Sequence, residues 1–270
     1  MAYTRGKYLR IVATIYLTLP YTLVKQRLFF RLRKAPQRLP DFLCIGAQKS
    51  GTTWLNEQLK KHPGVCMPAI KETRYFDWYF YRPLKWYRSH FRCEAGKVIG
   101  DVTPGYSIIE KGRIRFIRRV MPDVKIILLL RDPRERAWSS ARYHFGNQLG
   151  RDLKTVPDEE FFAHFQKGWV KRMGDYETIW RKWSSVFPRE QILVIFNEEI
   201  SKHPEEVMNR ICSFIGVEKQ FDKTYLSIQP NKSEEMQIPA ALKKYLDEIY
   251  LPVIRSMPQW LGMENKFWKE

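Results

Sequence analysis

The sequence predicts an α/β fold, with a single P-loop-like domain built on a central parallel β-sheet that helices flank. Short apolar runs at residues 42–45, 125–130 and 192–196 have the length and composition of fully buried strands. The first run leads into a glycine-containing loop, and helical spacing recurs between and after the runs. Strands that alternate with helices indicate a parallel sheet whose ligands bind at the carboxyl ends of the strands.

The individual elements follow from apolar spacing and from proline positions. Residues 53–61 place Trp54, Leu55 and Leu59 at helical intervals, directly after the first loop. Pro122 and Pro133 bound the second strand, and Pro133 also opens the next helix. Further helices are predicted from residue 134 onward and at residues 176–187, 204–215 and 240–253.

Length and composition favour one globular domain with an anionic partner. The 270 residues are 44% hydrophobic and 14% aromatic, which is typical of a packed core and excludes a disordered chain. Lysine and arginine number 47 against 29 aspartates and glutamates, so the formal net charge is +18. Such an excess favours a nucleotide, an acidic or sulfated glycan, a nucleic acid or an anionic membrane face as partner, over charge that serves solubility alone.

The first forty residues differ from the rest, and we assign residues 1–40 to a basic and apolar N-terminal helical segment. Its apolar run YLRIVATIYLTLPYTLV, residues 8–24, is broken by Pro20 and is shorter than the ~20 residues of a spanning helix. No small-residue cleavage site of a signal peptide follows it. The domain itself is expected at residues 41–270.

Two interpretations of this segment stay open. The lysines and arginines within residues 5–34 suit a helix that lies on an anionic membrane surface. A helix packed on the domain explains the same pattern. We therefore expect a cytoplasmic protein, with peripheral contact to the cytoplasmic membrane face as the open alternative.

The cysteines predict neither a disulfide framework nor a metal site. Four of them lie far apart without a C-x-x-C pair, and a chain of this length can build a core without disulfides. We expect reduced, buried side chains at Cys44, Cys66, Cys93 and Cys212. Because no histidines and cysteines have metal-ligand spacing, no metal is expected.

The loop GAQKSGTTWL, which begins at Gly46, departs from a Walker A sequence in one respect. Gly46 and Gly51 have the Walker A spacing, but the lysine stands at position 49 instead of directly after the second glycine. A strand, such a loop and a helix N-terminus surround an anion with backbone N–H groups, and Lys49 adds a point charge. Hydroxyl donors are available on Ser50, Thr52 and Thr53. The alternative is an ordinary strand-to-helix turn.

A second candidate clamp for an anion is LLLRDPRERAWSS, residues 128–140. Arg131 follows the second predicted strand, so it should emerge at the same sheet edge as the first loop. Ser139 lies about two helical turns further on, so the two side chains can share a phosphate group. An ion pair of Arg131 with Asp132 or Glu135 is the alternative.

Together these two motifs resemble the 5′-phosphosulfate loop and the 3′-phosphate motif of sulfotransferases that use 3′-phosphoadenosine 5′-phosphosulfate (PAPS). Two segments between them are similar to the glycan branch of that family, the heparan-sulfate type, and to its bacterial relatives. KETRYFD, which begins at Lys71, resembles the branch's K-E-x-x-F-F-D, and GDVTPGYS, residues 100–107, resembles its E-K-T-P-x-Y-F. The resemblance is strong over residues 41–145 and weaker toward Trp268.

The resemblance implies transfer of a sulfuryl group from PAPS to a hydroxyl, less often an amine, of a carbohydrate or related acceptor. Adenosine 3′,5′-bisphosphate is the product. A sulfuryl group carries one negative charge less than a phosphoryl group, so Lys49 can stabilise the leaving phosphate without the Mg²⁺ of a kinase. The implied cofactor-binding residues are Gln48, Lys49, Ser50, Gly51, Thr52, Thr53 and Trp54 in the loop, with Arg131 and Ser139 at the 3′-phosphate.

The resemblance also implies a general base and acceptor contacts. Glu72 matches the glutamate that removes the acceptor's proton in glycan sulfotransferases, although an ion pair with Lys71 or Arg74 is the alternative. Lys71, Arg74, Asp101 and His144 are the candidate substrate contacts. The sequence departs from the family at Asp101-Val102, where the branch has Glu-Lys. Lys232 and Ser233 are the candidates for the loop over the adenosine.

Other functions remain as alternatives. The same chemistry can serve a tyrosyl-peptide or lipid acceptor. A P-loop kinase is disfavoured because the sequence lacks G-K-[ST] and a clear Walker B carboxylate. A non-catalytic basic module for nucleic acid or membranes would fit the charge, but the aromatic residues cluster in one segment instead of alternating with basic ones. We therefore expect no nucleic-acid partner.

Overall fold

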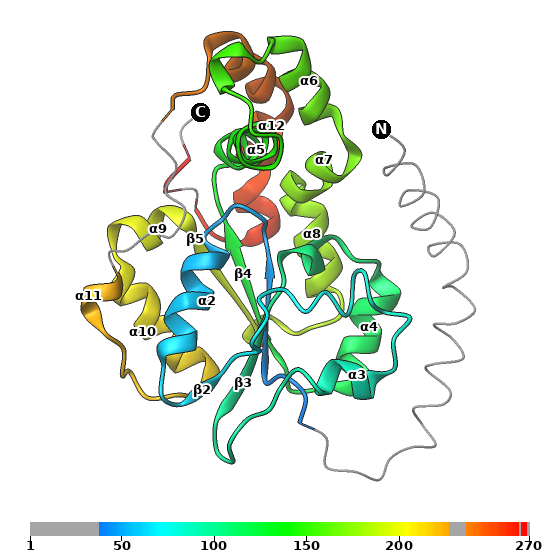
Figure 1. Ribbon diagram of the computed structural model, residues 1–270, viewed down its shortest axis with the longest axis vertical. Helices are drawn as coiled ribbons and strands as arrows, with labels where there is room; N and C mark the ends of the chain where they lie inside the picture. Colours follow the sequence, from blue (N-terminus) through cyan, green and yellow to red (C-terminus); the bar gives the residue numbers. More distant parts are fainter. Residues whose placement is uncertain (1–37, 227–235, 265, 269–270) are drawn as a thin grey trace.

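The computed structural model describes residues 38–226, 236–264 and 266–268, and these build an α/β domain (Figure 1). Five parallel strands form its central sheet in the order β2-β3-β1-β4-β5. The strands are β1 (Phe42–Gly46), β2 (Val65–Cys66), β3 (Val98–Val102), β4 (Lys125–Leu130) and β5 (Ile192–Phe196). The predicted fold class is confirmed. The N-terminal segment, Lys232 and Ser233 lie outside the described residues.

Two strands, β2 and β3, were not predicted from the sequence. β2 has two residues, and β3 interrupts its apolar pattern with Gly100 and Asp101. The glycine is required by packing, because a Cβ atom there would lie 2.0 Å from the ring of Phe42 on β1. The neighbouring Asp101 pairs in register with Leu43 of β1. The strand therefore lacks the regular pattern of apolar residues on which strand prediction depends, because one position is a glycine and the next is a buried carboxylate.

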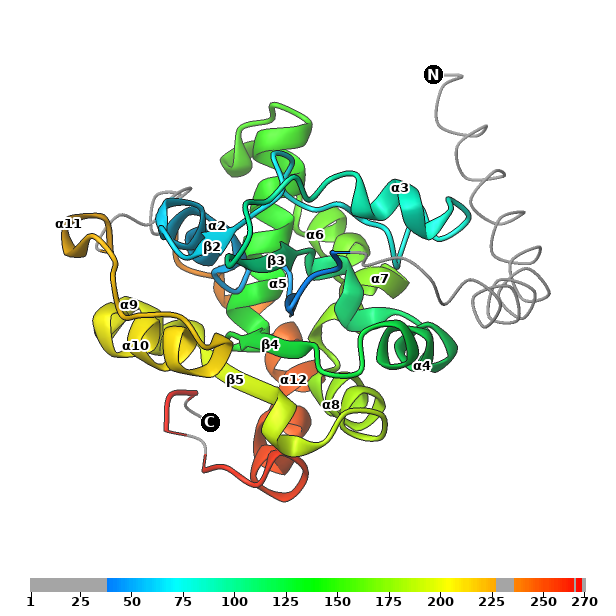
Figure 2. The same cartoon turned by 90° about the horizontal axis from the view of Figure 1, so that it is seen from below.

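Helices cover both faces of the sheet (Figure 2). Leu43 and Ile126 point into a core shared with α4 and α8, whereas Cys44 and Ile127 point into a core shared with α2 and α10. Alternate residues of each central strand are thus buried on opposite sides, as expected for a parallel sheet. The helices are α2 (Thr52–Lys61), α3 (Leu84–Arg88), α4 (Lys111–Val120), α5 (Pro133–Arg142), α6 (Asp158–Gln166), α7 (Gly168–Gly174), α8 (Tyr176–Ser184), α9 (Asn197–Lys202), α10 (Pro204–Ile215), α11 (Lys223–Leu226) and α12 (Ala240–Leu261).

A third group of helices lies beyond the carboxyl ends of the strands. There α5, α6 and α12 pack around Trp138, Phe165 and Leu246 (Figure 1, top). The last helix runs eight residues past the predicted end at residue 253, although it contains Pro252 and Pro258. Its apolar side chains remain buried on both sides of the prolines, so packing overrides their effect on the helix.

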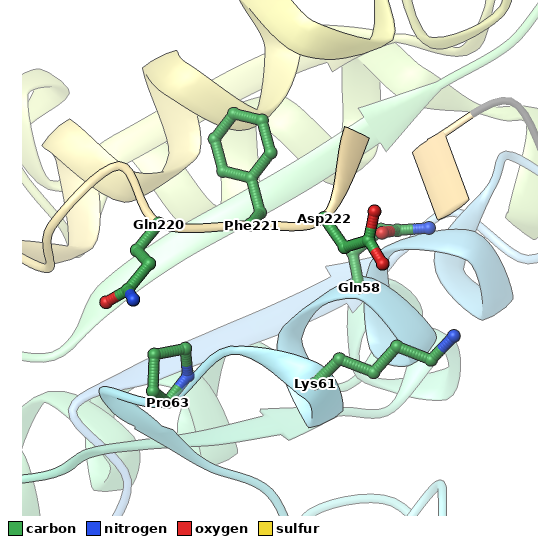
Figure 3. A pocket seen from close by; sticks show the side chains of 6 residues that line it. All are labelled: Gln58, Lys61, Pro63, Gln220, Phe221 and Asp222. Carbon is green, nitrogen blue, oxygen red and sulfur yellow. The ribbon is translucent and has the colours of Figure 1, made fainter. Parts of the chain in front are cut away.

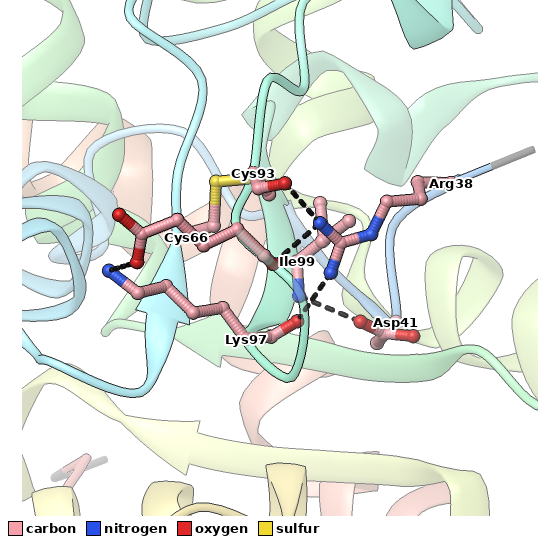
Figure 4. Close-up of a disulfide and its surroundings, with 7 residues drawn as sticks. Arg38, Asp41, Cys66, Cys93, Lys97 and Ile99 are labelled. Atoms are coloured by element: carbon pink, nitrogen blue, oxygen red, sulfur yellow. Dashed lines mark hydrogen bonds and ion pairs between the residues drawn. A yellow bond between two sulfur atoms is a disulfide. The ribbon is translucent and has the colours of Figure 1, made fainter.

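A disulfide between Cys66 and Cys93 contradicts the prediction of four reduced cysteines (Figure 4). Cys66 lies on β2 and Cys93 lies in the connection that returns to β3, so the pairing of these two strands brings the cysteines together. The Arg38 guanidinium donates to the backbone carbonyls of Cys93, Glu94 and Lys97, which fixes this corner further. The disulfide could not be predicted from the sequence because neither β2 nor β3 was predicted. Cys44 and Cys212 are free and buried.

Loss of this disulfide should lower the stability of the domain. The bond closes a loop of 27 residues in the unfolded chain, for which loop-closure entropy predicts about 3–4 kcal/mol. Denaturant titration of the wild type should therefore show a lower midpoint with reductant than without it. The double variant Cys66→Ser/Cys93→Ser should have the midpoint of the reduced wild type, and this midpoint should not change with reductant. Equal midpoints for oxidised and reduced wild type would contradict the assignment.

The described residues contain neither a helix that could span a membrane nor a cluster that could hold a metal ion. None of the helices within residues 38–226, 236–264 and 266–268 combines the length and apolarity that crossing a bilayer requires. The same part of the chain contains no group of three or more histidine, cysteine, aspartate or glutamate side chains that could hold a metal ion.

Candidate active site

A cavity of about 1030 Å³ opens where several strands end. Such a volume can accept a nucleotide, because small-molecule sites typically measure about 300–1000 Å³. Four of its lining residues directly or closely follow the carboxyl ends of β1, β3, β4 and β5, and these are Gln48, Pro104, Arg131 and Asn197. The cavity therefore occupies the position at which α/β sheets bind ligands.

A smaller hollow of about 160 Å³ lies at the opposite end of α2 (Figure 3). Its walls are the C-terminal turn of α2, the residues after it and the connection from α10 to α11. They comprise Gln58, Lys61, Pro63, Gln220, Phe221 and Asp222. This volume is below the range of nucleotide sites, and no strand points its carboxyl end into it. The larger cavity is thus the candidate site.

The loop after β1 presents backbone N–H groups to the cavity. Gly51 precedes α2 with φ 95°, a left-handed conformation, and a Cβ atom there would lie 2.9 Å from both Asn197 Nδ2 and Ile200 Cδ1. No side chain caps α2 and no acidic residue lies in its first turn. The free N–H groups and the positive end of the helix dipole therefore remain available for an anion.

Lys49 and Arg131 meet in this cavity, as the two-motif interpretation requires. β1 and β4 are neighbours in the sheet, and Arg131 Nη1 lies 3.4 Å from the Lys49 carbonyl oxygen. Ser139 lines the same cavity from α5. The alternative ion pair exists too, since Arg131 Nη2 lies 3.4 Å from Glu135 Oε2. Asp132 instead caps α5 by accepting from the backbone N–H of Arg134.

The cavity carries more positive than negative charge. Two carboxylates, Glu72 and Glu135, face five cationic side chains: Lys49, Lys71, Arg74, Arg131 and Arg142. Burial, with further repulsion from Arg131, Arg142 and Lys71, lowers the pKa of Lys49 from 10.5 to about 8. Lys49 Nζ also lies 4.5 Å above the ring of Tyr143. Burial and mutual repulsion disfavour the charged forms of these cations in the free protein. An anion that binds here relieves the repulsion, so its binding is favourable.

The lowered pKa of Lys49 predicts a pH dependence of anion binding. Below about pH 8 the ammonium is already charged, whereas above it binding of an anion must be accompanied by proton uptake. The affinity for adenosine 3′,5′-bisphosphate should therefore fall by up to about tenfold per pH unit above pH 8. Titration calorimetry in buffers of different ionisation enthalpy measures both effects. Lys49→Arg should abolish this dependence, because arginine stays protonated; an unchanged profile would contradict the assignment.

The segment Lys71–Arg74 forms another wall of the cavity. Lys71 Nζ donates to Thr53 Oγ1 at 2.8 Å and so joins this segment to the loop after β1. Glu72 Oε1 lies 3.7 Å from Lys71 Nζ, and Glu72 Oε2 lies 3.4 Å from Arg74 Nε. The ion-pair alternative for Glu72 is thus realised, yet the carboxylate still lines the cavity.

Backbone strain is concentrated at this site. Among the described residues, the non-glycine residues with positive φ are Lys49 (67°), Glu72 (63°) and Arg74 (55°), and all three line the cavity. Left-handed backbone costs about 1–2 kcal/mol for a residue with a side chain, and it persists only where surrounding contacts enforce it. Strain of this kind is typical of sites where function fixes the side-chain direction.

Most residues that the sequence singled out line the cavity. They are Gln48, Lys49, Gly51, Thr52, Thr53, Trp54, Lys71, Glu72, Arg74, Arg131 and Ser139. Ser50 belongs to the same loop but is fully buried and does not line the cavity. Trp54 is almost fully buried, and its indole N–H donates to the Leu226 carbonyl at 3.0 Å, so it also anchors α2.

Asp101 is fully buried and does not line the cavity, which contradicts its prediction as a substrate contact. Its carboxylate is fully buried on β3 and accepts hydrogen bonds from four hydroxyl groups, those of Thr73, Tyr87, Thr103 and Tyr106. Burial raises the pKa of Asp101, and these hydrogen bonds oppose the rise. A buried carboxylate with these partners is placed to orient other side chains.

His144 does not line the cavity, and its contact with substrate stays a prediction. The imidazole Nδ1 lies 2.9 Å from Gln148 Oε1, and the ring stacks on His164 with centroids 5.0 Å apart. Gln148, its hydrogen-bond partner, lines the cavity.

Several cavity residues were not found from the sequence. Tyr143 and Gln148 belong to the π-helix Tyr143–Gln148 that continues α5. A π-helix leaves no sequence pattern, although it is frequent at functional sites. Asn197 could have been found, because it directly follows the predicted strand 192–196. Met236 and Gln237 also line the cavity and had no signal.

Fold and site together define an α/β protein with a cationic nucleotide-sized cavity, in which an uncapped helix N-terminus, a lysine and an arginine converge beside a carboxylate. Nucleotide-dependent group transferases have this arrangement. Residues 39–250 match the model of the sulfotransferase domain family, so the chain belongs to that family of transferases.

Curated relatives agree with this assignment. The membrane-associated sulfotransferase kil1 of Dictyostelium discoideum is 40% identical over 130 residues, which are 47% of this chain and 27% of that protein. Human heparan sulfate glucosamine 3-O-sulfotransferase 6 is 25% identical over 84% of this chain and 73% of its own length. The chain spans about half the length of several other heparan sulfate glucosamine 3-O-sulfotransferases that it matches.

Solved structures share the fold. A sulfotransferase from Alicyclobacillus acidocaldarius superposes with a TM-score of 0.67 at 24% identity, and the match covers 84% of this chain and 98% of that one. Mouse sulfotransferase SULT7A1, solved in complex with PAP, gives a TM-score of 0.55 at 17% identity, with 83% and 88% covered.

Proposed function

We propose that this chain transfers a sulfuryl group from PAPS to a hydroxyl group of a carbohydrate acceptor. The observation that carries the proposal is the meeting of Lys49 and Arg131 in one cavity that also contains Glu72. Two cations from adjacent strand ends suit a nucleotide with phosphates at both ends, and a nearby carboxylate suits removal of the acceptor's proton.

The residues present fit such a donor. The uncapped N-terminus of α2 and Lys49 suit the 5′-phosphate, while Arg131 and Ser139 suit the 3′-phosphate. Gln48 lines the cavity, and its buried Oε1 has no hydrogen-bond partner, as expected for an atom that a ligand satisfies. The PAP complex of SULT7A1 supports the same class of nucleotide.

In this proposal the donor supplies an activated sulfuryl group, and the chain supplies charge and a proton acceptor. Lys49 stabilises the negative charge that develops on the oxygen between sulfur and the leaving 5′-phosphate. Glu72 accepts the proton of the attacking hydroxyl, and the neighbouring Lys71 and Arg74 hold its carboxylate in the cavity. The hydroxyl oxygen forms its bond to sulfur while the bond from sulfur to the phosphate oxygen breaks.

Exposed aromatic rings near the cavity support a carbohydrate acceptor. Trp78 is 51% exposed and lies with its ring 4.5 Å from the guanidinium of Arg74, while Tyr143 is 45% exposed and lines the cavity. Aromatic faces can pack against sugar rings, and the adjacent cations suit acidic groups on such a chain. The names of the heparan sulfate relatives point to the same acceptor class.

The test is transfer from ³⁵S-labelled PAPS to a panel of acceptors. The panel holds N-sulfated and unsulfated heparan-type glycans, a tyrosine peptide and a hydroxylated lipid, each with and without Mg²⁺. We expect label on glycan that does not depend on Mg²⁺. Label on the peptide or lipid alone would contradict the acceptor class. Transfer of phosphate from ATP, with no transfer of label from PAPS, would contradict the reaction.

The disulfide leads us to place the domain in an oxidising compartment. Stable disulfides are rare where glutathione and thioredoxin keep thiols reduced, so the bond between Cys66 and Cys93 is at odds with the expected cytoplasmic location. Mass spectrometry after alkylation of protein taken directly from its source organism tests this; two free thiols at Cys66 and Cys93 would contradict it. Peripheral membrane contact through residues 5–34 stays a prediction.

A further inference from the structure

Asp101 is the centre of a buried polar network that the proposed chemistry does not use. The network consists of Asp101 and the hydroxyl groups of Thr73, Tyr87, Thr103 and Tyr106, and all five residues are fully buried or nearly so. Three of the hydroxyl groups lie 2.7–2.9 Å from Asp101 Oδ2, and the fourth lies 2.8 Å from Oδ1. A fully buried carboxylate with this many donors is expensive to build unless its position matters.

The network contains as many hydroxyl donors as the Asp101 carboxylate can accept. A carboxylate can accept about four hydrogen bonds and donates none, and each hydroxyl group has one hydrogen. Each of the four hydroxyl groups can therefore donate to Asp101. Thr73 Oγ1 and Tyr106 Oη also lie 2.9 Å apart, and the backbone N–H of Tyr75 donates to the Tyr106 oxygen at 3.0 Å. Every donor in the network has an acceptor.

The network reaches the cavity through one loop. Thr73 stands between Glu72 and Arg74, the two cavity residues with left-handed backbone, and its own side chain points into the protein. Thr73 binds Asp101 directly, and Tyr75 is held through Tyr106. Two hydrogen bonds from the network thus hold a strained backbone that would otherwise relax.

We propose that Asp101 is a positioning residue, which through Thr73 and Tyr106 holds the strained loop and keeps the Glu72 carboxylate in the cavity. This inference rests on the proposed function, in which Glu72 is the base. The rigid support comes from β3, which is hydrogen-bonded to β1 in the sheet. The network therefore couples the loop that carries the base to the strand that leads into the phosphate-binding loop.

The network offers matched variants. Thr73→Val removes the hydroxyl that joins the loop to Asp101 and keeps the side chain's shape, while Thr73→Ser restores the hydroxyl. Tyr87→Phe removes a hydrogen bond of the same kind, to the same carboxylate oxygen, from a residue outside the loop. Both Thr73→Val and Tyr87→Phe should lower the melting temperature by about 2–4 °C. Thr73→Val also removes the contact with Tyr106, so Thr73→Val alone removes bonds made by the loop itself.

The experiment combines hydrogen exchange of amides 71–75 with kinetics and bisphosphate binding. Thr73→Val should speed exchange in this loop about tenfold and lower kcat about tenfold, with bisphosphate affinity within about twofold of wild type. Thr73→Ser should restore both, and Tyr87→Phe should match wild type in both. Glu72→Gln, measured beside them, should lower kcat without changing loop exchange.

Two outcomes would overturn the inference: unchanged loop exchange in Thr73→Val, or equal losses in Thr73→Val and Tyr87→Phe. The second would mean that the network serves stability alone. Failure of the proposed function looks different, because wild type itself would then transfer no sulfuryl group or Glu72→Gln would be fully active. In that case loop exchange in Thr73→Val and Tyr87→Phe still decides whether Asp101 holds the loop.

Discussion

Lys49→Ala should lower kcat for sulfuryl transfer by about 10²–10³-fold. Removal of one charge-stabilising donor from a site where negative charge develops typically has this effect. The lysine lies in the cavity beside Arg131 and Arg142, where burial and their repulsion lower its pKa to about 8. Such an ammonium is a strong partner for an anion, because the anion removes the repulsion that the free protein contains.

The same substitution should not destabilise the fold. The pKa of Lys49 is lower in the folded protein than its ordinary value of 10.5, so the unfolded chain binds more protons between about pH 8 and 10.5, and stability rises with pH in that window. Below pH 8 the buried charge is unfavourable throughout, and alanine removes it. Lys60→Ala, on the exposed last turn of α2, is the control and should keep full activity. An active Lys49→Ala, or one that loses activity by unfolding, would contradict the role.

Glu72→Gln is expected to lower kcat by about 10²–10⁴-fold, the usual contribution of a general base. The amide cannot accept the hydroxyl proton, although it keeps the size of the side chain. Binding of adenosine 3′,5′-bisphosphate should change little, because the ion pairs of Glu72 are with Lys71 and Arg74 and not with Lys49 or Arg131, the proposed phosphate-binding cations. Activity and calorimetry on the same preparation separate the two effects.

Glu135→Gln is the matched control for this prediction. It removes a carboxylate of the same cavity, but one that pairs with Arg131 on the nucleotide side. At saturating donor its kcat should stay within a few-fold of wild type, while Glu72→Gln is nearly inactive. Equal loss in both variants would indicate a general effect of cavity charge and not a base at Glu72.

The sequence predicted the fold well where apolar runs are regular. β4, β5 and α10 have the predicted bounds, because a fully buried strand between two prolines and a helix after a proline leave clear patterns. β3 was not predicted, because Gly100 and Asp101 are explained only by contacts with residues distant in the sequence. Gly100 packs closely against another strand, and Asp101 belongs to a polar network. The disulfide was not predicted for the same reason, since Cys66 and Cys93 are brought together by strands that were not predicted.

For the candidate site, prediction worked for residues that directly follow a strand. Lys49 and Arg131 occupy such positions, and parallel strands bring them together. Residues that reach the cavity from a π-helix or a distant segment, such as Tyr143 and Gln237, left no local pattern. For Asp101 the motif gave the position of the residue in the chain but not the direction of its side chain, which is buried in the polar network.

The pairing of the two strand ends with the two phosphates is tested most directly by comparing two nucleotides. Wild type and Arg131→Ala are titrated with adenosine 3′,5′-bisphosphate and with adenosine 5′-monophosphate, which lacks the 3′-phosphate. Arg131→Ala should lose about 2–4 kcal/mol of affinity for the bisphosphate and almost none for the monophosphate. Lys49→Ala should weaken binding of both. If Arg131→Ala weakens both nucleotides equally, or neither, then Arg131 does not bind the 3′-phosphate and the central claim is wrong.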